Sequence, residues 1–467
     1  MTGRPATIGQ LRGSGWASVP VKEEVRRNAA ARIAAGRPVV RGVLGYDETV
    51  LPQLENALLA GHDVILLGER GQAKTRIIRS LVDLLDEETP VVAGSEINDD
   101  PYHPVSRAAR DLVAEHGEDT PVEWVGRDQR FGEKLATPDT SIADLIGEVD
   151  PIRVAEGRYL SDELTLHYGL VPRTNRGIFA INELPDLAER IQVGLLNVLE
   201  ERDVQVRGYK VRLPLDVLLV ASANPEDYTN RGRIITPLKD RFGAQIRTHY
   251  PLDVDTELEV VRQEWKPPAL GGVRVDVPAH MAEIVATITH EARRSASVNQ
   301  RSGVSVRLSV ANYETLVANA LRRALRLGEP DAVPRVSDLE ALASSTGGKV
   351  EIETLDDSEG GAVVEGVVRT AVLTVFRRRC RIDDYRPVLA GFDGGEAVNV
   401  GDDVPSAEYL AVLARFPALR GPVASLAGSE TPAAVASAVE LVLEGLHLSR
   451  RLNKHAVGGR ASYRTRG

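Results

Sequence analysis

Short apolar runs alternate with amphipathic segments over the first half of the chain. The runs 64–67, 177–181 and 217–223 each stop at a glycine or an asparagine. Runs this short and this uniformly apolar are typical of parallel strands that are buried on both faces. Between them, residues 75–86 and 186–202 carry apolar side chains at helical spacing. The alternation predicts an α/β fold built on a parallel sheet.

After about residue 250 helical spacing dominates. Helices are predicted at 255–265, 278–295, 307–327, 363–379, 407–415 and 433–452. Residues 347–361 and 391–404 are rich in glycine and acidic side chains, which predicts exposed connections. The basic tail 450–466 is expected to be frayed.

The strand predicted at 64–67 runs into Gly-Glu-Arg-Gly-Gln-Ala-Lys-Thr, the pattern of a phosphate-binding loop. Glycines let backbone N–H groups approach a polyphosphate, Lys74 would neutralise its β and γ oxygens, and the Thr75 hydroxyl would ligate Mg²⁺. The candidate nucleotide-binding residues are Gly68, Glu69, Arg70, Gly71, Gln72, Ala73, Lys74 and Thr75. The alternative is a glycine-rich turn that binds nothing. Ala73 replaces a glycine of the pattern, so we expect a negative φ there.

Polar residues follow the two later strands. P-loop enzymes place an acidic pair here, one member for Mg²⁺ through water and one for the attacking water. In this chain the pair is Asn182-Glu183, so Glu183 can act as the base but Asn182 brings no charge to the metal. Asn224 is a candidate for contact with the γ-phosphate, and Arg241 for stabilising the transferring phosphoryl group. The alternatives are an ordinary core strand, an Asn-Pro turn and a surface arginine.

Charge and composition exclude several classes of protein. The formal net charge of −10 disfavours a general nucleic-acid-binding role. Cys380 is the single cysteine, so one chain can form neither a disulfide framework nor a cysteine metal site. The first residues lack the apolar core of a signal peptide, and no stretch approaches the ~18 apolar residues of a membrane span. We therefore expect a cytoplasmic protein without membrane insertion.

Five motifs in this order resemble the AAA+ ATPases of the clade that holds the magnesium chelatase I subunits and the MoxR-type ATPases. The loop 68–75 is similar to the chelatase form G-D-R-G-x-G-K-S, with the alanine of MoxR-type loops at residue 73. Residues 176–183 resemble the Walker B segment R-G-I-L-Y-I-D-E, from which Asn182 departs. Residues 223–226 match sensor 1, residues 238–243 match the arginine-finger segment L-x-D-R-F-G, and residues 304–307 are similar to sensor 2. The resemblance covers roughly residues 40 to 330.

The resemblance implies a P-loop NTPase (AAA+) core at 40–250, with a helix-2 insert and a pre-sensor 1 hairpin at 203–213. It further implies an N-terminal helical extension at 1–39, a helical lid at 251–346, and a mainly helical C-terminal region at 347–467 with a flexible basic tail. Within the hairpin, whose alternation about Gly208 also predicts it, the candidate partner contacts are Arg207, Tyr209, Lys210 and Arg212. An edge hairpin kept soluble by its charges is an equal alternative for each of them.

The resemblance also implies chemistry. The cofactors would be ATP and Mg²⁺, with catalytic roles for Glu183, Asn224, Arg241 and Arg307. The metal contacts would come from Thr75 and Asn182. The family further suggests a homo-oligomeric, hexameric ring and a partner with a von Willebrand A-type domain. Such a motor would drive metal chelation, or remodel or mature another protein.

Asn182 leaves a rival function open. A chain that binds ATP but hydrolyses it slowly or not at all would serve as a nucleotide-binding scaffold. The sequence also lacks the G-A-F-T-G-A loop of σ⁵⁴ activators, which disfavours a transcription regulator of that type.

Overall fold

The computed structural model describes residues 4–150, 152, 163–200, 203–206, 209–224, 233–268, 272–299, 303–350, 357–393, 395–457 and 460–465. The chain divides into two compact units, residues 1–249 and 250–467. Each unit has hydrophobic cores of its own.

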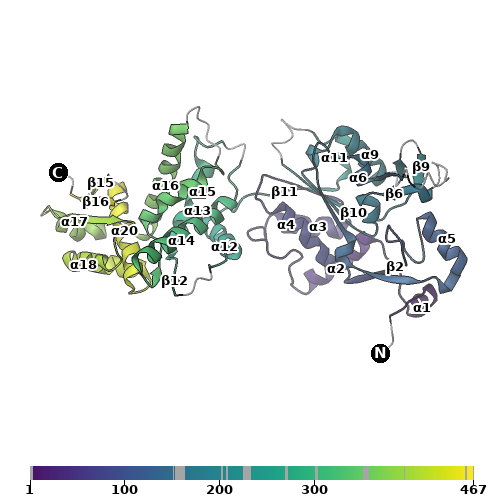
Figure 1. Ribbon diagram of the computed structural model, residues 1–467, viewed down its shortest axis with the longest axis horizontal. Coiled ribbons are helices and arrows are strands. Elements are labelled where there is room, and N and C mark those ends of the chain that lie inside the picture. The colour runs from purple at the N-terminus through teal and green to yellow at the C-terminus, as the bar shows by residue number, and fades with distance from the viewer. Residues whose placement is uncertain are drawn as a thin grey trace. The chain divides into compact units, whose positions relative to one another are not determined.

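The first unit is built on a five-stranded sheet with the strand order β11-β1-β10-β7-β4. The strands are β11 (Ala244–Arg247), β1 (Val64–Leu67), β10 (Val217–Ala223), β7 (Gly177–Asn182) and β4 (Phe131–Leu135). All neighbouring pairs are parallel. The predicted α/β class with a parallel sheet is confirmed (Figure 1).

Helices cover both faces of this sheet (Figure 1). One face packs against α2 (Val21–Ala34), α3 (Val50–Ala60) and α4 (Lys74–Ser80). The opposite face packs against α9 (Glu189–Glu200) and α11 (Thr236–Arg241). Alternate strand residues serve the two faces: Ile178 and Ala180 belong to the first core, Phe179 and Ile181 to the second. Strands buried on both faces must be apolar throughout, which explains the continuous runs in the sequence.

The two helices predicted in the first unit differ from the observed ones at their ends. The helix expected at 75–86 is an α-helix only to Ser80 and continues as a 3-10 turn over Leu81–Leu84. The helix expected from residue 186 begins at Glu189, after a 3-10 turn over Leu184–Asp186. Helix ends are the part that apolar spacing specifies least.

The rest of the first unit consists of short elements. They are α1 (Ile8–Gly13), α5 (Arg107–His116), α6 (Ile142–Leu145) and α8 (Leu170–Arg173). Antiparallel pairs join β2 (Glu88–Val92) to β3 (Val122–Gly126), β5 (Gly147–Val149) to β6 (Leu166–Tyr168), and β8 (Asp203–Val206) to β9 (Tyr209–Arg212). The last pair is the predicted hairpin.

A buried ion pair attaches the N-terminal helix α2 to the sheet. Glu24 accepts hydrogen bonds from Arg130 Nη1 at 2.8 Å and from Arg130 Nη2 at 2.5 Å. Arg130 directly precedes β4, is 1% exposed, and donates from Nε to Arg176 O at 2.8 Å. The N-terminal segment is thus part of the first unit's packing rather than a loose extension.

The second unit is mainly helical. Its main helices are α12 (Val254–Glu264), α13 (Ala279–Arg294), α14 (Arg307–Leu327), α16 (Asp357–Arg379), α18 (Glu408–Arg415), α19 (Arg420–Ala427) and α20 (Pro432–Leu448). One hydrophobic core runs from Leu258 to Tyr463 and includes residues on both sides of position 346. The boundary expected at 346/347 therefore falls inside this unit.

Three expectations for the C-terminal region were wrong. The helix α16 begins at Asp357, inside the expected connection 347–361. The expected connection 391–404 contains a strand, β14 (Val398–Gly401). The tail forms the strands β15 (Asn453–Val457) and β16 (Arg460–Arg464), and β16 pairs with both β14 and β15. The Tyr463 ring is 2% exposed, so the burial of one aromatic residue anchors a segment whose charge suggested fraying.

Among the described residues, no single helix has both the length and the apolar character of a membrane span. One pair of consecutive helical segments, Glu408–Arg415 and Pro417–Ala427, meets the test only when joined, and it bends by 107°.

Candidate functional site

The carboxyl ends of three adjacent strands bring the loop 68–75 and the polar strand-end residues together. The register pairs Leu67 with Ala223 and Ala221 with Ile181. The loop, Asn224 and Glu183 therefore leave the sheet at the same edge. In open α/β sheets ligands bind at this carboxyl edge.

Lys74 lies inside the loop and is 6% exposed. Its ammonium donates a hydrogen bond to Gly68 O and another, at 2.8 Å, to Glu69 O. These two carbonyls orient the ammonium but carry no full charge. A polyphosphate oxygen is the stronger acceptor, because hydrogen bonds between ionised groups are about twice as strong as neutral ones.

Hydrogen bonds fasten the loop to the neighbouring strand ends. Gln72 Oε1 accepts from Glu69 N at 3.0 Å and from Thr248 Oγ1 at 2.7 Å. Gly68 N donates to Ala223 O at 3.0 Å. A Cβ added at Gly68 would lie 1.9 Å from Thr248 Oγ1 and 2.2 Å from Gln72 Oε1. A side chain at position 68 would require Thr248 and Gln72 to move, and Thr248 is a supporting residue that the sequence pattern did not reveal.

Tyr46 is a second supporting residue that was not predicted. Its hydroxyl lies 3.0 Å from Gln72 O and 2.6 Å from His249 O, so its single proton can be donated to either carbonyl. Burial raises the pKa of Tyr46 to about 12, so the hydroxyl keeps its proton at neutral pH. The loop is therefore braced from the segment that precedes α3.

The backbone at Ala73 contradicts the expectation of a negative φ. Ala73 has φ 56° and ψ 11°, which is the left-handed region, and Gly71 has φ 78°. A left-handed residue that carries a Cβ costs about 1–2 kcal/mol. Left-handed residues in such a turn point backbone N–H groups into a common concavity, which is an anion-binding arrangement. The loop therefore retains its strained shape without a glycine at position 73.

The polar residues at the strand ends are largely buried, and hydrogen bonds connect Asn182, Glu183 and Ser222. Asn182 and Asn224 are 7% and 3% exposed, and Glu183 is half-buried with φ 55°. Asn182 Nδ2 donates to Glu133 Oε1 at 2.6 Å. Ser222 Oγ donates to Asn182 Oδ1 and accepts from Glu183 N, both at 3.2 Å. The left-handed backbone at Glu183 is the kind of local strain that clusters at functional sites.

Glu133 was missed by the sequence analysis. It lies in β4, whose sequence Phe-Gly-Glu-Lys-Leu is no apolar run and predicts no buried strand. Glu133 contacts Asn182 because of the register between β4 and β7, in which Leu135 pairs with Asn182. No spacing along the chain encodes that register.

Arg241 does not lie at this edge. It ends α11, is exposed, and precedes β11, whose first residue Ala244 pairs with Val64. The phosphate-binding loop instead follows Leu67, at the other end of β1. A four-residue strand spans about 10 Å. Arg241 therefore lies near the amino ends of the strands, whereas the loop lies at their carboxyl ends.

Arg307 belongs to the second unit. It is the first residue of α14 and is exposed. The predicted loop, strand-end residues and Arg241 all belong to the first unit.

The hairpin β8–β9 connects α9 to β10. Arg207 lies outside the described residues, and so do the sensor 1 neighbours Pro225 and Glu226. Tyr209, Lys210 and Arg212 form β9, whose backbone pairs with β8.

The residues of the loop fit a nucleoside triphosphate with its magnesium ion. The close packing around Gly68, the enclosed Lys74 ammonium and the Thr75 hydroxyl at the start of α4 match what a polyphosphate requires. Within the described ranges, no group of three or more His, Cys, Asp or Glu residues could hold a metal by itself.

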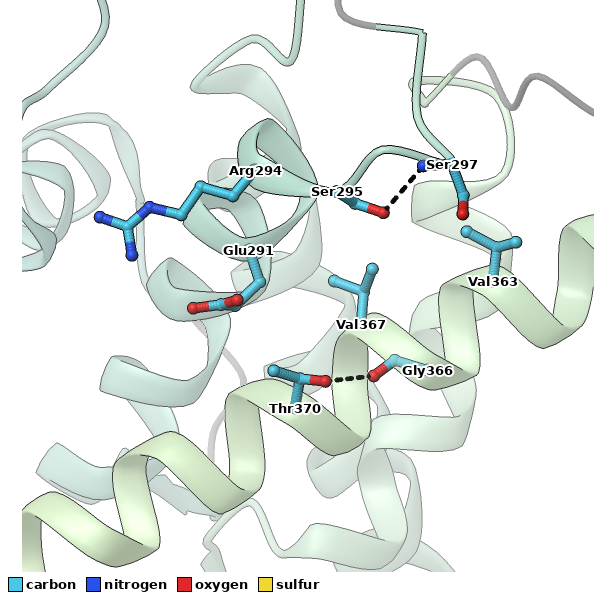
Figure 2. A pocket seen from close by; sticks show the side chains of 8 residues that line it. All are labelled: Glu291, Arg294, Ser295, Ser297, Val363, Gly366, Val367 and Thr370. Carbon is cyan, nitrogen blue, oxygen red and sulfur yellow. Dashed lines mark hydrogen bonds between the residues drawn. The ribbon is translucent and has the colours of Figure 1, made fainter.

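A pocket of about 390 Å³ in the second unit is a separate feature (Figure 2). Its walls come from α13 and the turn after it, with Glu291 and Arg294, and from α16, with Val363 and Val367. None of its lining residues belongs to the loop or to the strand ends. It is therefore not the nucleotide site.

Comparison with known proteins gives partial matches. The family model of the Sigma-54 interaction domain matches residues 156–241, which include β7, the hairpin, β10 and α11. The magnesium-chelatase subunit ChlI-1 of Arabidopsis thaliana is 30% identical over 238 residues, which are 49% of this chain and 52% of the relative. The magnesium-chelatase 38 kDa subunit of Rhodobacter capsulatus is 28% identical over 270 residues, covering 52% of this chain and 69% of the relative.

The chain thus spans about half the length of the plant relative. Among solved structures, a chain from a complex of the magnesium chelatase subunits BchI and BchD is similar over 71% of this chain and 98% of that chain. Its sequence identity is 20% and its TM-score is 0.36, too low to add to the sequence matches.

Proposed function

We propose, from the premise that this chain belongs to the AAA+ ATPases of the magnesium chelatase subunit I and MoxR-type clade, that it binds and hydrolyses ATP with Mg²⁺ as a cytoplasmic ring motor. The observation that carries the proposal is the convergence at one sheet edge of the loop 68–75, Asn182, Glu183 and Asn224. The loop supplies binding, and the strand ends supply groups that can act on water.

Each residue has a distinct role in this proposal. Lys74 holds the phosphates by charge, and Thr75 contributes its hydroxyl to Mg²⁺. Glu183 accepts a proton from the attacking water, and Asn224 orients that water or the γ-phosphate. The bound Mg-ATP brings the transferring phosphoryl group and a metal that offsets its charge. Asn182 holds its place by hydrogen bonds to Glu133 and Ser222 rather than by charge.

The position of Arg241 supports a ring. An arginine near the edge opposite to its own loop is poorly placed for the phosphate bound to the same chain. It is suited to a phosphate on a neighbouring copy, as an arginine finger supplied in trans. We therefore propose a homo-oligomer, with six subunits by family analogy, in which Arg241 completes the adjacent site. By family analogy we keep Arg307, the first residue of α14 in the second unit, as a candidate sensor of the nucleotide.

What the motor acts on is a further proposal. Relatives of the matched half are named as subunits of magnesium chelatase, and on that analogy the ring would drive either metal chelation or the remodelling or maturation of a partner protein with a von Willebrand A-type domain. The hairpin β8–β9 is a candidate for that contact. Co-purification of the tagged full chain and a porphyrin metallation assay would separate these two roles.

The rival proposal is a scaffold that binds ATP without turnover. It is favoured only by the absent carboxylate at residue 182. The ring motor is favoured by the carboxylate of Glu133 at 2.6 Å from the Asn182 amide, because charge is present close to that position.

The test is Glu183→Gln beside the parent chain. The variant should keep its ATP affinity, measured by calorimetry, and should lose phosphate release, because an amide cannot accept the proton of the attacking water. A variant that releases phosphate at the parental rate would remove Glu183 from the mechanism. A parent chain that binds ATP but releases no phosphate would establish the scaffold instead.

Assembly has its own test. Arg241→Ala and Lys74→Ala should each be inactive alone, the first able to bind ATP and the second not. A mixture should recover part of the turnover, because an intact loop in the first variant can meet Arg241 of the second. If the mixture co-assembles by chromatography yet stays inactive, Arg241 does not act in trans.

A further inference from the structure

A chain of four polar side chains crosses the sheet beside the phosphate-binding loop. It links the loop's helix α4 to the three strands β4, β7 and β10. The members are Arg79, Glu133, Asn182 and Ser222. Arg79 Nε donates to Glu133 Oε2 at 2.7 Å, and the other carboxylate oxygen, Oε1, accepts from Asn182 Nδ2 at 2.6 Å.

The strand register explains how these residues meet. Glu133 pairs with Ala180 and Leu135 pairs with Asn182, so Glu133 and Asn182 are diagonal neighbours on one face. Ala180 packs in the core that includes α4, which identifies this face as the one under the loop's helix. The side chains of Glu133 and Asn182 therefore lie on the face of the sheet that α4 covers. Both Thr75 and Arg79 belong to this helix.

The geometry of α4 relates the residue that binds this carboxylate to the predicted metal contact. Thr75 and Arg79 are four residues apart in α4 and so lie on one side of the helix. Arg79 reaches Glu133 from that side. The Glu133 carboxylate is thus held between Arg79, one helical turn after Thr75, and the Asn182 amide.

Arg79 does not cancel the charge of Glu133. The Arg79 side chain is 64% exposed and that of Glu133 is 21% exposed. Solvent-exposed ion pairs contribute little net attraction, because water screens them. A dication that arrives with the nucleotide phosphates is a much stronger source of attraction for the same carboxylate.

We propose that Glu133 is a further positioning residue of the magnesium site: its carboxylate supplies, from β4 and across the Asn182 amide, the negative charge that Asn182 itself lacks at the end of β7. The inference rests on the proposed function, because it assumes that Mg-ATP binds at this edge. Asn182 then serves as a spacer: its amide binds the Glu133 carboxylate of β4 and so holds that charge near the end of β7. Its carbonyl oxygen accepts from Ser222, which in turn accepts from the backbone of Glu183, so the group also fixes the candidate base.

The competing explanation is purely structural: Glu133 would only fasten α4 to β4 through Arg79. The two explanations differ in what depends on Mg²⁺. If Glu133 has only a structural role, its loss should change folding and nucleotide affinity equally with and without Mg²⁺. If its charge acts on the metal, its loss should change only the gain in nucleotide affinity that Mg²⁺ provides.

The experiment measures binding of a fluorescent ADP analogue to the full chain, first in EDTA and then across a Mg²⁺ titration. Glu133→Gln should raise the Mg²⁺ concentration at half-saturation about tenfold, as loss of one nearby charge predicts. Its affinity in EDTA should be unchanged or tighter, because a negative charge near the phosphates has been removed. Glu123→Gln is the matched control, since it makes the same change at an exposed position of β3 and should alter neither value.

An exchange of the two groups provides the rescue. Asn182→Asp alone adds a second carboxylate beside Glu133, so it should not raise the half-saturating Mg²⁺ concentration above that of the parent. The double variant Glu133→Gln with Asn182→Asp has one carboxylate and one amide again, and its half-saturating Mg²⁺ concentration should return to within about twofold of the parent.

Three results would overturn the inference. They are an unchanged Mg²⁺ half-saturation in Glu133→Gln, an equal loss of affinity with and without the metal, and a double variant no better than Glu133→Gln. In each case the parent chain still binds the nucleotide, so the proposed function stands. A parent chain that binds no nucleotide at all would overturn the proposed function itself.

Discussion

Gly68→Ala would test the observed shape of the phosphate-binding loop. The new Cβ would lie 1.9 Å from Thr248 Oγ1 and 2.2 Å from Gln72 Oε1, between two atoms that now share a 2.7 Å hydrogen bond. Overpacking costs about 1–3 kcal/mol, and the lost hydrogen bond costs about 1 kcal/mol. If the native loop is retained, the free energy of unfolding should therefore fall by about 2–4 kcal/mol.

The loop can relieve that strain by moving, and then nucleotide affinity is lost instead. The same 2–4 kcal/mol corresponds to a loss of affinity between about 30-fold and about 1000-fold. Urea denaturation and calorimetry with ATP measure the two effects. Gly13→Ala is the control, because a Cβ there meets nothing within 4 Å. A Gly68→Ala chain with both parental stability and parental affinity would refute the described contacts around the loop.

Three further perturbations test the fold. Arg130→Met should lower the free energy of unfolding, measured by urea denaturation, by about 3–5 kcal/mol, because it leaves Glu24 buried without its partner. Adding Glu24→Leu should recover most of that loss. An effect of Arg130→Met below about 1 kcal/mol would contradict the buried pair. Ala73→Gly should preserve ATP affinity in calorimetry and stabilise the chain by up to about 1 kcal/mol, because φ is positive at residue 73. Ala73→Val should destabilise the chain for the same reason. A valine variant more stable than the glycine variant would exclude the left-handed backbone. Burial, helped by the charge of Arg379, lowers the pKa of His280 to about 4. Its unfolded form takes up a proton near pH 6.5 but the folded form only near pH 4, so stability should fall as the pH drops through this window, by up to about 3 kcal/mol. His280→Gln should lose that part of the pH dependence in urea denaturation, and a parental pH profile in the variant would count against the assignment.

The parallel core was predictable because its strands are apolar on both faces. The runs at 64–67 and 217–223 and the strand that ends at Asn182 are the observed β1, β10 and β7. The edge strand β4 was not predictable, since Phe-Gly-Glu-Lys-Leu carries two charged residues in five positions. An edge strand has one neighbour and is partly exposed, so its sequence need not be apolar.

The site was predictable where it depends on sequence-local patterns. The loop 68–75 and the strand-end residues meet because parallel strands end together, and that follows from the fold class. The supports Tyr46, Thr248 and Glu133 come from distant segments and meet the site only through the observed register and packing. The left-handed backbone at Ala73 was missed because the residue type argues against it, and the surrounding hydrogen bonds impose it.

The C-terminal errors have a similar cause. Local glycine and charge content predicted connections and a frayed tail, whereas long-range pairing of β14, β15 and β16 decides the structure there. Tyr463, Val398 and Val400 are the buried residues that stabilise this small sheet.

The most direct test of the central claim is phosphate release from ATP by the purified chain, measured beside a Lys74→Ala chain prepared in the same way. The account predicts Mg²⁺-dependent, saturable release by the parent chain and none above background by the variant, because Lys74 is the enclosed cation of the loop. Equal release by both chains would show that hydrolysis, if any, occurs elsewhere. No release by a parent chain that still binds ATP would contradict the motor and leave a nucleotide-binding scaffold.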